Sequence, residues 1–398
     1  AIHVENQSAI VIHNSRFLTN TAHLGGAVSL YRSDGEIHGS VFRGNQAIGR
    51  PGFRGFGGAI KASSLDTPDD GSTNRAPASL ILTDSIIEGS WGGVGVVSQL
   101  GGGVHVGGDT NRQYGENGVL RIQSLAANRM PVTITDVVFT DLHVDEVITG
   151  QTSSGGAIYG ELIDLHMSGC LMTDSHATGT WARGGAAGFI SQSRLDISDT
   201  TFAGNSADRE GGAFYVIGSQ VDVDSCTFIA NDVSPGVAED DATSRGAAMF
   251  STVQAGKSLS VTGTVANSVF VDNVGLPIRD DDRLLTDGGY INDIRYNGNQ
   301  FYNTTFGQKM YKDSIVQHWA MTTPELNSLV VDRDPDTVGN CNPGSPPECT
   351  KKSQVANVAY GSEPTTGTLL AVPPSIIDEV ANGDPATATV SFLGYAWS

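Results

Sequence analysis

The sequence predicts an all-β solenoid, in which short strands follow one another around a stack of coils. A phrase recurs along the chain with a spacing near that of Phe202 and Phe228, which are 26 residues apart, a period typical of solenoid repeats. Each repeat contains three short alternating runs, such as LDI, TTF and AFYV, which predict three strands separated by turns. Small and turn-forming residues return at fixed places, which indicates coils stacked in register.

Four columns define the repeat, and we expect the apolar and small columns to stack inside the solenoid. A large apolar residue occurs at Phe17, Phe42, Ile87, Phe139, Met172, Phe202, Phe228 and Phe270. Five residues earlier stands an aliphatic residue or Met, at Ile12, Ile37, Leu82, Ile134, Met167, Ile197, Val223 and Val265. Two residues before the large residue stands a mostly small one, at Ser15, Ser40, Ser85, Val137, Cys170, Thr200, Cys226 and Ser268. Directly before the small residue stands one suited to turns or left-handed backbone, at Asn14, Gly39, Asp84, Asp136, Gly169, Asp199, Ser225 and Asn267.

These columns resemble a right-handed parallel β-helix of the pectate-lyase-like class. The phrases F-x-x-N and G-G-A-[IVF], as at 202–205 and 211–214, resemble the repeats of the chlamydial-type polymorphic outer-membrane proteins. The resemblance covers about residues 1–300 and implies a solenoid of about nine coils. It is specific for fold and says less about function, because one fold can carry many different sites.

The repeat divides the chain into a parallel β-helix over 1–306 and a C-terminal cap with an irregular, β-rich tail over 307–398. We expect the first strand of successive coils at 27–30, 59–62, 103–106, 157–160, 186–189, 213–216, 247–250 and 290–291. Long polar insertions are expected at 46–56, 63–78, 107–131, 143–154, 232–245 and 274–287, and such insertions usually carry binding. Helical spacing over 309–319 predicts a capping helix, and 369–372 and 387–393 are expected to be strands.

The composition points to an extracellular or cell-surface protein. The chain has 398 residues, with 23 basic and 43 acidic side chains and a formal net charge of -20, which argues against a nucleic-acid partner. No apolar run reaches the length of a membrane span. Cys170 and Cys226 share one column two coils apart, too far for a disulfide, and we expect them to be buried thiols. Cys341 and Cys349 flank a turn-rich segment, which predicts a local disulfide suited to an oxidising compartment.

Strand alternation divides the first strand of each coil into an inward and an outward column. The inward column is apolar: Ile2, Val4, Val28, Leu30, Ile60, Ala62, Val104, Val106, Ile158, Ala187, Phe189, Phe214, Val216, Ala248 and Phe250. The outward column is mixed: His3, Ser29, Lys61, His105, Tyr159, Gly188, Tyr215, Met249 and Asn292. Lys61, His105 and Tyr159 are therefore expected on three successive coils, about 5 Å apart.

Two kinds of carbohydrate site could use this outward column. Lys61, His105 and Tyr159 could supply the cation, base and acid that β-elimination from a uronate polysaccharide requires. Tyr159 and Tyr215 could instead stack against sugar rings, with Arg54 in a neighbouring insertion as a further ligand-binding residue. The plain alternative is an exposed sheet face with mixed polar residues.

Acidic runs and paired histidines are candidate metal ligands. Asp280, Asp281 and Asp282 form a run that could bind calcium, as could the runs at 69–70 and 239–241, although a solvated loop explains such runs equally well. No run has the spacing of a known calcium loop. His13 and His38 occupy equivalent second-strand positions and are expected to face outward.

The chain begins with a phrase that resembles the middle of a coil. We expect 1–4 to form a first strand whose inward Ile2 and Val4, with Ile10, are covered by upstream residues, a long loop or another protein subunit. We favour a secreted or cell-surface structural or adhesive protein, as a subunit of an extracellular assembly. A polysaccharide lyase or other glycan-active enzyme and a glycan-binding module stay open as alternatives.

Overall fold

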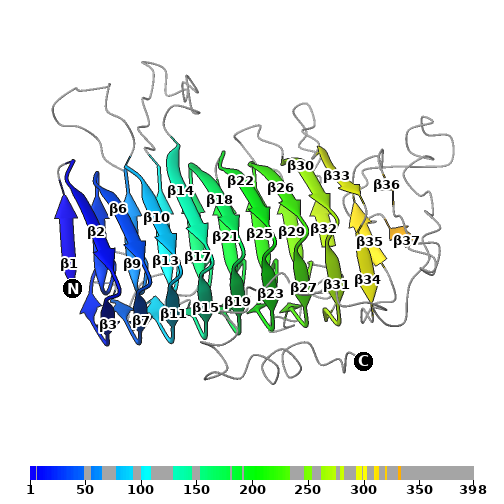
Figure 1. Cartoon of the computed structure of the whole chain (residues 1–398). Coiled ribbons are helices and arrows are strands. Elements are labelled where there is room, and N and C mark those ends of the chain that lie inside the picture. The colour runs from blue at the N-terminus through cyan, green and yellow to red at the C-terminus, as the bar shows by residue number, and fades with distance from the viewer. Residues whose placement is uncertain are drawn as a thin grey trace, which may run out of the picture.

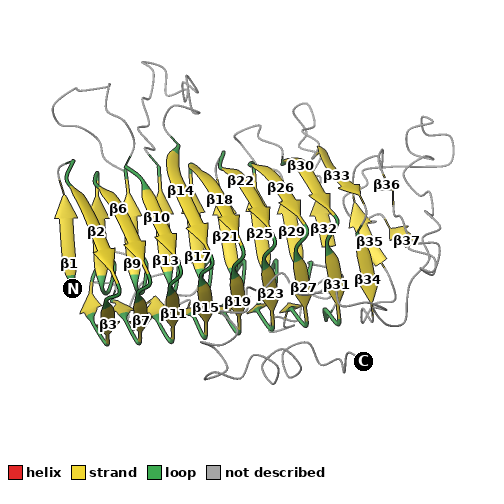
Figure 2. Cartoon of the chain, in the orientation of Figure 1, coloured by secondary structure: helices red, strands yellow, loops and turns green. Residues whose placement is uncertain are grey.

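The fold is a parallel β-helix in which each of the first seven coils contributes one strand to each of four sheets, A to D, and the later described strands belong to sheets A, B and C (Figure 1). The computed structural model describes residues 1–5, 7–48, 55–64, 78–92, 100–108, 129–145, 153–179, 182–190, 192–233, 246–252, 261–274, 278–281, 293–297, 299–302, 309–312, 319–320 and 330–332. These residues form strands, turns and loops and contain no helix (Figure 2). An all-β solenoid with parallel strands is therefore confirmed.

The strands of each sheet follow chain order, because every coil lies directly on the preceding one. Sheet A contains β1 (Ile2–Glu5), β5 (Val28–Tyr31), β9 (Ile60–Ser63), β13 (Val104–Gly107), β17 (Ile158–Glu161), β21 (Ala187–Ile190), β25 (Phe214–Ile217), β29 (Met249–Thr252), β32 (Ile278–Asp281), β35 (Lys309–Lys312) and β37 (Val330–Asp332). Sheet B contains β2 (Ala9–His13), β6 (Asp34–His38), β10 (Leu80–Thr83), β14 (Met130–Thr135), β18 (Ile163–Ser168), β22 (Arg194–Ser198), β26 (Gln220–Asp224), β30 (Thr262–Ala266), β33 (Asp293–Asn297) and β36 (Trp319–Ala320). Sheet C contains β3 (Arg16–Leu18), β7 (Val41–Arg43), β11 (Ile86–Glu88), β15 (Val138–Thr140), β19 (Leu171–Thr173), β23 (Thr201–Ala203), β27 (Thr227–Ile229), β31 (Val269–Val271) and β34 (Gln300–Tyr302).

Sheet D is a fourth, narrow sheet that the sequence did not predict. It contains β4 (Thr21–Ala22), β8 (Gln46–Ala47), β12 (Trp91–Gly92), β16 (His143–Asp145), β20 (His176–Thr178), β24 (Ser206–Ala207) and β28 (Asp232–Val233). The expectation of three strands per coil is wrong, because strands of two or three residues are too short to show alternation.

Most of the core is one apolar cluster whose columns match those expected from the repeat. The predicted large apolar residues pair in register from Phe17 through Phe270. The rings of Phe202 and Phe228 stack with centroids 4.9 Å apart, and those of Phe228 and Phe270 stack at 4.8 Å. Phe202 and Phe228 are 1% and 0% exposed, so the register is confirmed.

The small column forms a ladder of hydrogen bonds between coils. The Ser40 hydroxyl accepts from the backbone N–H of Ser15 at 3.1 Å, and the Ser85 hydroxyl accepts from that of Ser40 at 3.0 Å. Each hydroxyl also donates to the carbonyl two residues earlier, as Ser85 does to Thr83 at 2.7 Å. A short hydroxyl suits this column because it reaches a backbone group of the adjacent coil.

A second ladder uses asparagine at the F-x-x-N position. The Asn231 Oδ1 accepts from both the backbone and side-chain N–H groups of Asn205, at 3.1 Å and 3.0 Å. The Asn231 side chain donates to the Phe202 carbonyl and to Asn273 Oδ1, at 3.0 Å each. All three asparagines are 0% exposed, so these bonds satisfy buried polar groups that would otherwise be costly.

The corner between sheets B and C depends on left-handed backbone at the predicted turn column. All eight residues predicted there have positive φ: Asn14, Gly39, Asp84, Asp136, Gly169, Asp199, Ser225 and Asn267. A second such column lies between sheets C and D: Thr19, Gly44, Gly89, Asp141, Asp174, Gly204, Ala230 and Asp272. These corners turn the chain within two residues.

The G-G phrase before sheet A has two distinct requirements. Gly211 has φ +66°, which favours glycine. A Cβ at Gly212 would lie 2.2 Å from the Ala247 carbonyl oxygen, so the coils approach too closely there for a side chain.

The register expected for the strand at 247–250 is wrong by one residue. Met249, not Ala248, pairs with Phe214, and Phe250 pairs with Tyr215 in the outward column. Gly246 has φ +68° and takes the place of the first glycine, so Ala247 stands where a second glycine is usual. The alanine of the G-G-A motif was therefore taken to be Ala247, whereas the pairing shows that it is Ala248.

The solenoid continues past the predicted boundary at residue 306. Beyond that residue, sheet A continues with β35 and β37, so its described strands number eleven rather than about nine. The capping helix over 309–319 is wrong, because this range contains the strand β35 and ends at the first residue of β36, and these strands pair with β32 and β33. The sequence 290–291, expected to be the next first strand, lies outside the described residues, as do 369–372 and 387–393.

The two cysteines of the core column are buried and free, as predicted. Cys170 donates its backbone N–H to the Thr200 hydroxyl at 3.4 Å, which places one coil between the two thiols. Burial raises the pKa of both thiols to about 12. Cys341 and Cys349 lie outside the described residues, and their disulfide stays a prediction.

Replacing Phe202 with Ala should lower the free energy of unfolding by about 3–5 kcal/mol, because a fully buried ring is lost from the stack. Phe17→Ala is the matched control, since Phe17 occupies the same column and is only half-buried. Chemical denaturation of both variants measures the effect. An equal loss in both would contradict the proposed packing.

Replacing Asn231 with Ala should cost about 3 kcal/mol or more, because the buried N–H groups of Asn205 lose their acceptor. Asn231→Ser should keep only a hydrogen bond to the carbonyl two residues earlier. Ser175, which occupies the same column, makes such a bond to the Thr173 carbonyl at 3.2 Å. Equilibrium unfolding should order the stabilities as wild type, Ser and Ala. A neutral Ala variant would show that the ladder does not stabilise the coil stack.

Candidate functional site

Among the described strands, variation in coil length is confined to the two sides of sheet A. Every described passage from sheet B to sheet C, and from sheet C to sheet D, leaves two residues between strands. By contrast, β9 ends at Ser63 and β10 begins at Leu80, while β13 ends at Gly107 and β14 begins at Met130. The passages into sheet A vary as well, since β28 ends at Val233 and β29 begins at Met249. Insertions therefore frame sheet A, the usual arrangement for a binding face.

The outward face of sheet A is covered by residues that precede the G-G phrase. Six of them form a parallel ladder, one residue from each coil: Leu24, Phe56, Leu100, Ser154, Arg183 and Glu210. Phe56 lies against His105, with ring centroids 4.8 Å apart, and the Lys61 Nζ lies 5.6 Å from the Phe56 ring centroid. A Cβ at Gly188 would lie 2.2 Å from the Ser154 hydroxyl. This covering ladder makes the face a second packed layer.

Lys61, His105 and Tyr159 lie on neighbouring strands, as predicted. His105 pairs with Lys61 on one side and Tyr159 on the other, and the His105 and Tyr159 rings stack at 5.3 Å. However, His105 and Tyr159 are each only 4% exposed, and His105 Nδ1 has no hydrogen-bond partner within the part of the chain that the structure describes. Burial, together with the charge of Lys61, lowers the pKa of His105 to about 3. Burial also lowers the pKa of Lys61.

Tyr215, expected as a sugar-stacking residue, has both ring faces engaged by neighbours. The Arg183 guanidinium lies 5.1 Å from its ring centroid, and Phe250 stacks on it at 5.8 Å. Arg183 also pairs with buried Glu210 at 2.9 Å. Burial acts to lower the pKa of Arg183, but Tyr215 and Glu210 outweigh it and raise that pKa above its ordinary value. Tyr215 is 1% exposed, and Arg54 lies outside the described residues.

The acidic run at 280–282 was expected to lie in a loop, but part of it belongs to a strand. Asp280 and Asp281 belong to β32 and pair with Ser251 and Thr252 of β29, while Asp282 lies outside the described residues. The described ranges contain no group of three or more acidic, His or Cys side chains placed to hold a metal. Calcium binding stays a prediction.

His13 and His38 are neighbours in sheet B, as their equivalent positions predicted. Their rings stack with centroids 5.0 Å apart, and His38 Nδ1 lies 2.9 Å from the Thr83 hydroxyl. His13 is exposed and His38 is half-buried.

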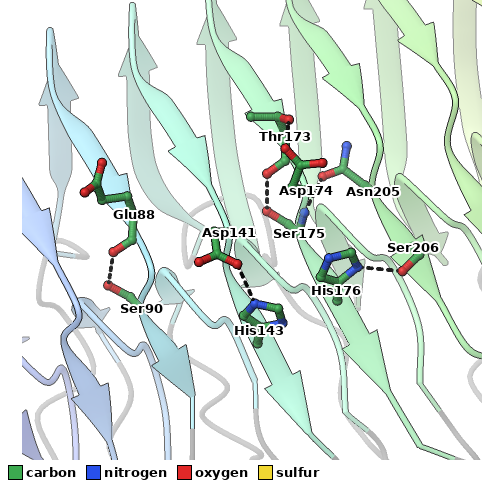
Figure 3. Close-up of polar contacts among 10 residues, drawn as sticks. All are labelled: Glu88, Ser90, Asp141, His143, Thr173, Asp174, Ser175, His176, Asn205 and Ser206. Atoms are coloured by element: carbon green, nitrogen blue, oxygen red, sulfur yellow. Dashed lines mark hydrogen bonds and ion pairs between the residues drawn. The ribbon is translucent and has the colours of Figure 1, made fainter. Parts of the chain in front are cut away.

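A further histidine pair, which the sequence reasoning missed, lies beside the corner between sheets C and D (Figure 3). His143 of β16 and His176 of β20 pair in register, with ring centroids 5.0 Å apart. His143 Nε2 lies 2.8 Å from Asp141 Oδ1, and His176 Nδ1 lies 2.6 Å from the Ser206 hydroxyl. Burial and the neighbouring His143 lower the pKa of His176, although nearby carboxylates oppose them. The sequence does contain a signal for this pair, because His143 and His176 follow the core residues Phe139 and Met172 at the same distance. This signal was missed because sheet D was not predicted.

The first strand lies as expected. Ile2 and Val4 pair with Val28 and Leu30 of β5. Ile2, Val4 and Ile10 are half-buried and pack against the core cluster.

Comparison with known families identifies a part of one repeat of this solenoid. Residues 199–217 match the Chlamydia polymorphic membrane protein repeat. The matched residues run from the corner before β23, through the asparagine ladder and the G-G phrase, to the end of β25. The resemblance expected from these phrases is thus confirmed for the repeat, and it agrees with a cell-surface protein.

Neither the curated proteins nor the solved structures contain a match to this chain. The likeness to the pectate-lyase-like class therefore stays a prediction. Within the described ranges, no helix has the length and apolar character needed to cross a membrane.

Acidification should destabilise the protein through His105. The unfolded chain binds a proton near the ordinary pKa of 6.5, whereas the folded chain does so only near 3, so stability is lost as the pH falls between these values. The loss should amount to a few kcal/mol in total, since one pKa unit corresponds to about 1.4 kcal/mol. Denaturant midpoints at about pH 7 and about pH 4.5 measure it.

His105→Phe should reduce this pH dependence, because it keeps a ring in the layer and removes the titrating group. His3→Phe is the matched control, since His3 occupies the same outward column and its side chain is 57% exposed. Unchanged pH dependence in His105→Phe would rule out His105 as its source.

Proposed function

We propose that this chain is a cell-surface structural or adhesive solenoid, which displays the insertions beside sheet A to a partner molecule. The observation that carries this proposal is the confinement of length variation to the two sides of sheet A. The match to a polymorphic membrane protein repeat supports the surface setting.

The rest of the coil is built as a rigid support. Two ladders of buried hydrogen bonds join successive coils, and two left-handed corners fix the path of each coil. The eleven strands of sheet A extend over about 48 Å at ordinary strand spacing. Such a scaffold holds insertions from different coils in a fixed row.

The packed layer on sheet A favours this proposal over a lyase or a glycan platform on the strand face itself. A catalytic base must reach the substrate proton within hydrogen-bonding distance. His105 lies beneath Phe56, and Tyr215 lies between Arg183 and Phe250. These side chains are therefore not available for contact with a partner of the folded protein.

The proposal is tested by replacing 65–77 and 109–128 with short Gly-Ser linkers in the full chain. Beads carrying the wild-type chain should bind at least one surface within a panel of immobilised polysaccharides and copies of the chain itself. The linker variant should bind that surface with an affinity at least about tenfold lower than that of the wild type, while keeping its circular dichroism spectrum and denaturation midpoint. A control with Thr133→Ser and His166→Gln on the outward face of sheet B should bind like the wild type. Equal binding by the linker variant would overturn the assignment of the contact surface, and binding by none of the proteins would overturn the adhesive role.

A further inference from the structure

The outward face of sheet C changes character along the solenoid. One outward column consists of Arg16, Val41, Ile86, Val138, Leu171, Thr201, Thr227 and Val269. The other consists of Leu18, Arg43, Glu88, Thr140, Thr173, Ala203, Ile229 and Val271. Both columns contain charged residues on the strands β3 to β11 and none on the strands β15 to β31. The later part of this face is therefore an uncharged, largely apolar strip.

This uncharged strip is buried although its side chains point away from the core. The buried members and their exposed fractions are Val138 1%, Leu171 3%, Thr201 1%, Thr227 2%, Val269 9%, Thr173 4%, Ala203 4%, Ile229 3% and Val271 0%. On the earlier strands of the same columns, Leu18 is 50% exposed, Arg16 and Arg43 are exposed, and Val41 and Ile86 are half-buried. Strands β7 and β11 have neighbours on both sides, just as β19 and β23 do, so neighbours within the sheet do not account for the difference.

A covering segment must therefore lie over the strip. The described strands all belong to the wall of the solenoid, and none of them crosses the outward face of sheet C (Figure 2). The buried Thr201 hydroxyl also has no hydrogen-bond partner among the described residues, so a polar group of the strip is left for the cover to meet.

We propose that the C-terminal segment 333–398 of the same chain docks along the outward face of sheet C from β15 to β31. Its stretches 364–377 and 385–398 contain no charged residue, which matches the uncharged strip. The other long segments outside the described residues, such as 65–77 and 109–128, begin and end beside sheet A and carry Asp and Arg side chains. A covering chain without charges avoids burying unpaired ions against the strip.

The reach of the segment fits this placement. Five strands from β15 to β31 span about 19 Å, which about six extended residues can cover. The last described strand, β37, ends at Asp332, after which the remaining chain is long enough to return along several coils. Without the cover, the strip would be an exposed apolar patch of the kind that promotes association.

Thiol labelling of the full chain tests whether the strip is covered. Ala203→Cys places a thiol on the strip, and Leu18→Cys places one in the same column on the exposed first coil. Both are made with Cys341→Ser and Cys349→Ser, while Cys170 and Cys226 stay as buried thiols. The thiol at position 203 should react with maleimide on the order of 100-fold more slowly than that at position 18. Equal rates with an unchanged denaturation midpoint would overturn the proposal.

Photo-crosslinking then identifies the cover. A benzophenone amino acid replaces Thr140, which is half-buried at the edge of the strip, and Arg43 in the same column is the exposed control. Mass spectrometry of a mixture of isotope-labelled and unlabelled chains should find links from position 140 to 333–398 within one chain, and none from position 43. Links to another segment, links between chains, or no links from position 140 would each overturn the assignment.

Discussion

The structure depends on keeping every coil in the same register as its neighbours. A slip of one residue in any strand would turn its apolar side chains outward, because side chains alternate across a strand. Two features prevent this. The described corners flanking sheet C take two residues with a left-handed turn, and the small and asparagine ladders join equivalent positions of successive coils. The same constraint fixes sheets B, C and D and leaves sheet A as the place where chain can be added.

The sequence allowed the register of sheets B and C to be predicted for nearly the whole solenoid. Each predicted column is specified by a physical requirement that few residue types meet, such as left-handed backbone at Asp84 or a short hydroxyl at Ser85. Where the requirement was relaxed, the prediction failed. Ala247 occupies a position usually taken by glycine, and for this reason the register predicted for the following strand was wrong by one residue.

The candidate site was predicted less well for a different reason. Alternation says which way a side chain points, but it does not say what lies above it. Lys61, His105 and Tyr159 were placed correctly on adjacent strands, yet the covering ladder with Phe56 and Ser154 was not foreseen. That ladder is made of single residues before the G-G phrase, and an isolated residue has no periodicity to detect.

The two covered faces differ in their chemistry, and this difference explains how each is covered. The outward face of sheet A buries ionisable groups, including His105 and Glu210, which pairs with the partly exposed Arg183. Buried charges require partners at fixed distances, and residues from the same or the next coil are held by the register that fixes the sheet. The strip on sheet C carries no charge, so it needs only apolar contact and a few hydrogen bonds. A segment that arrives from outside the repeat can supply these without matching its register, and for this reason the uncharged face is the one suited to a cover distant in sequence.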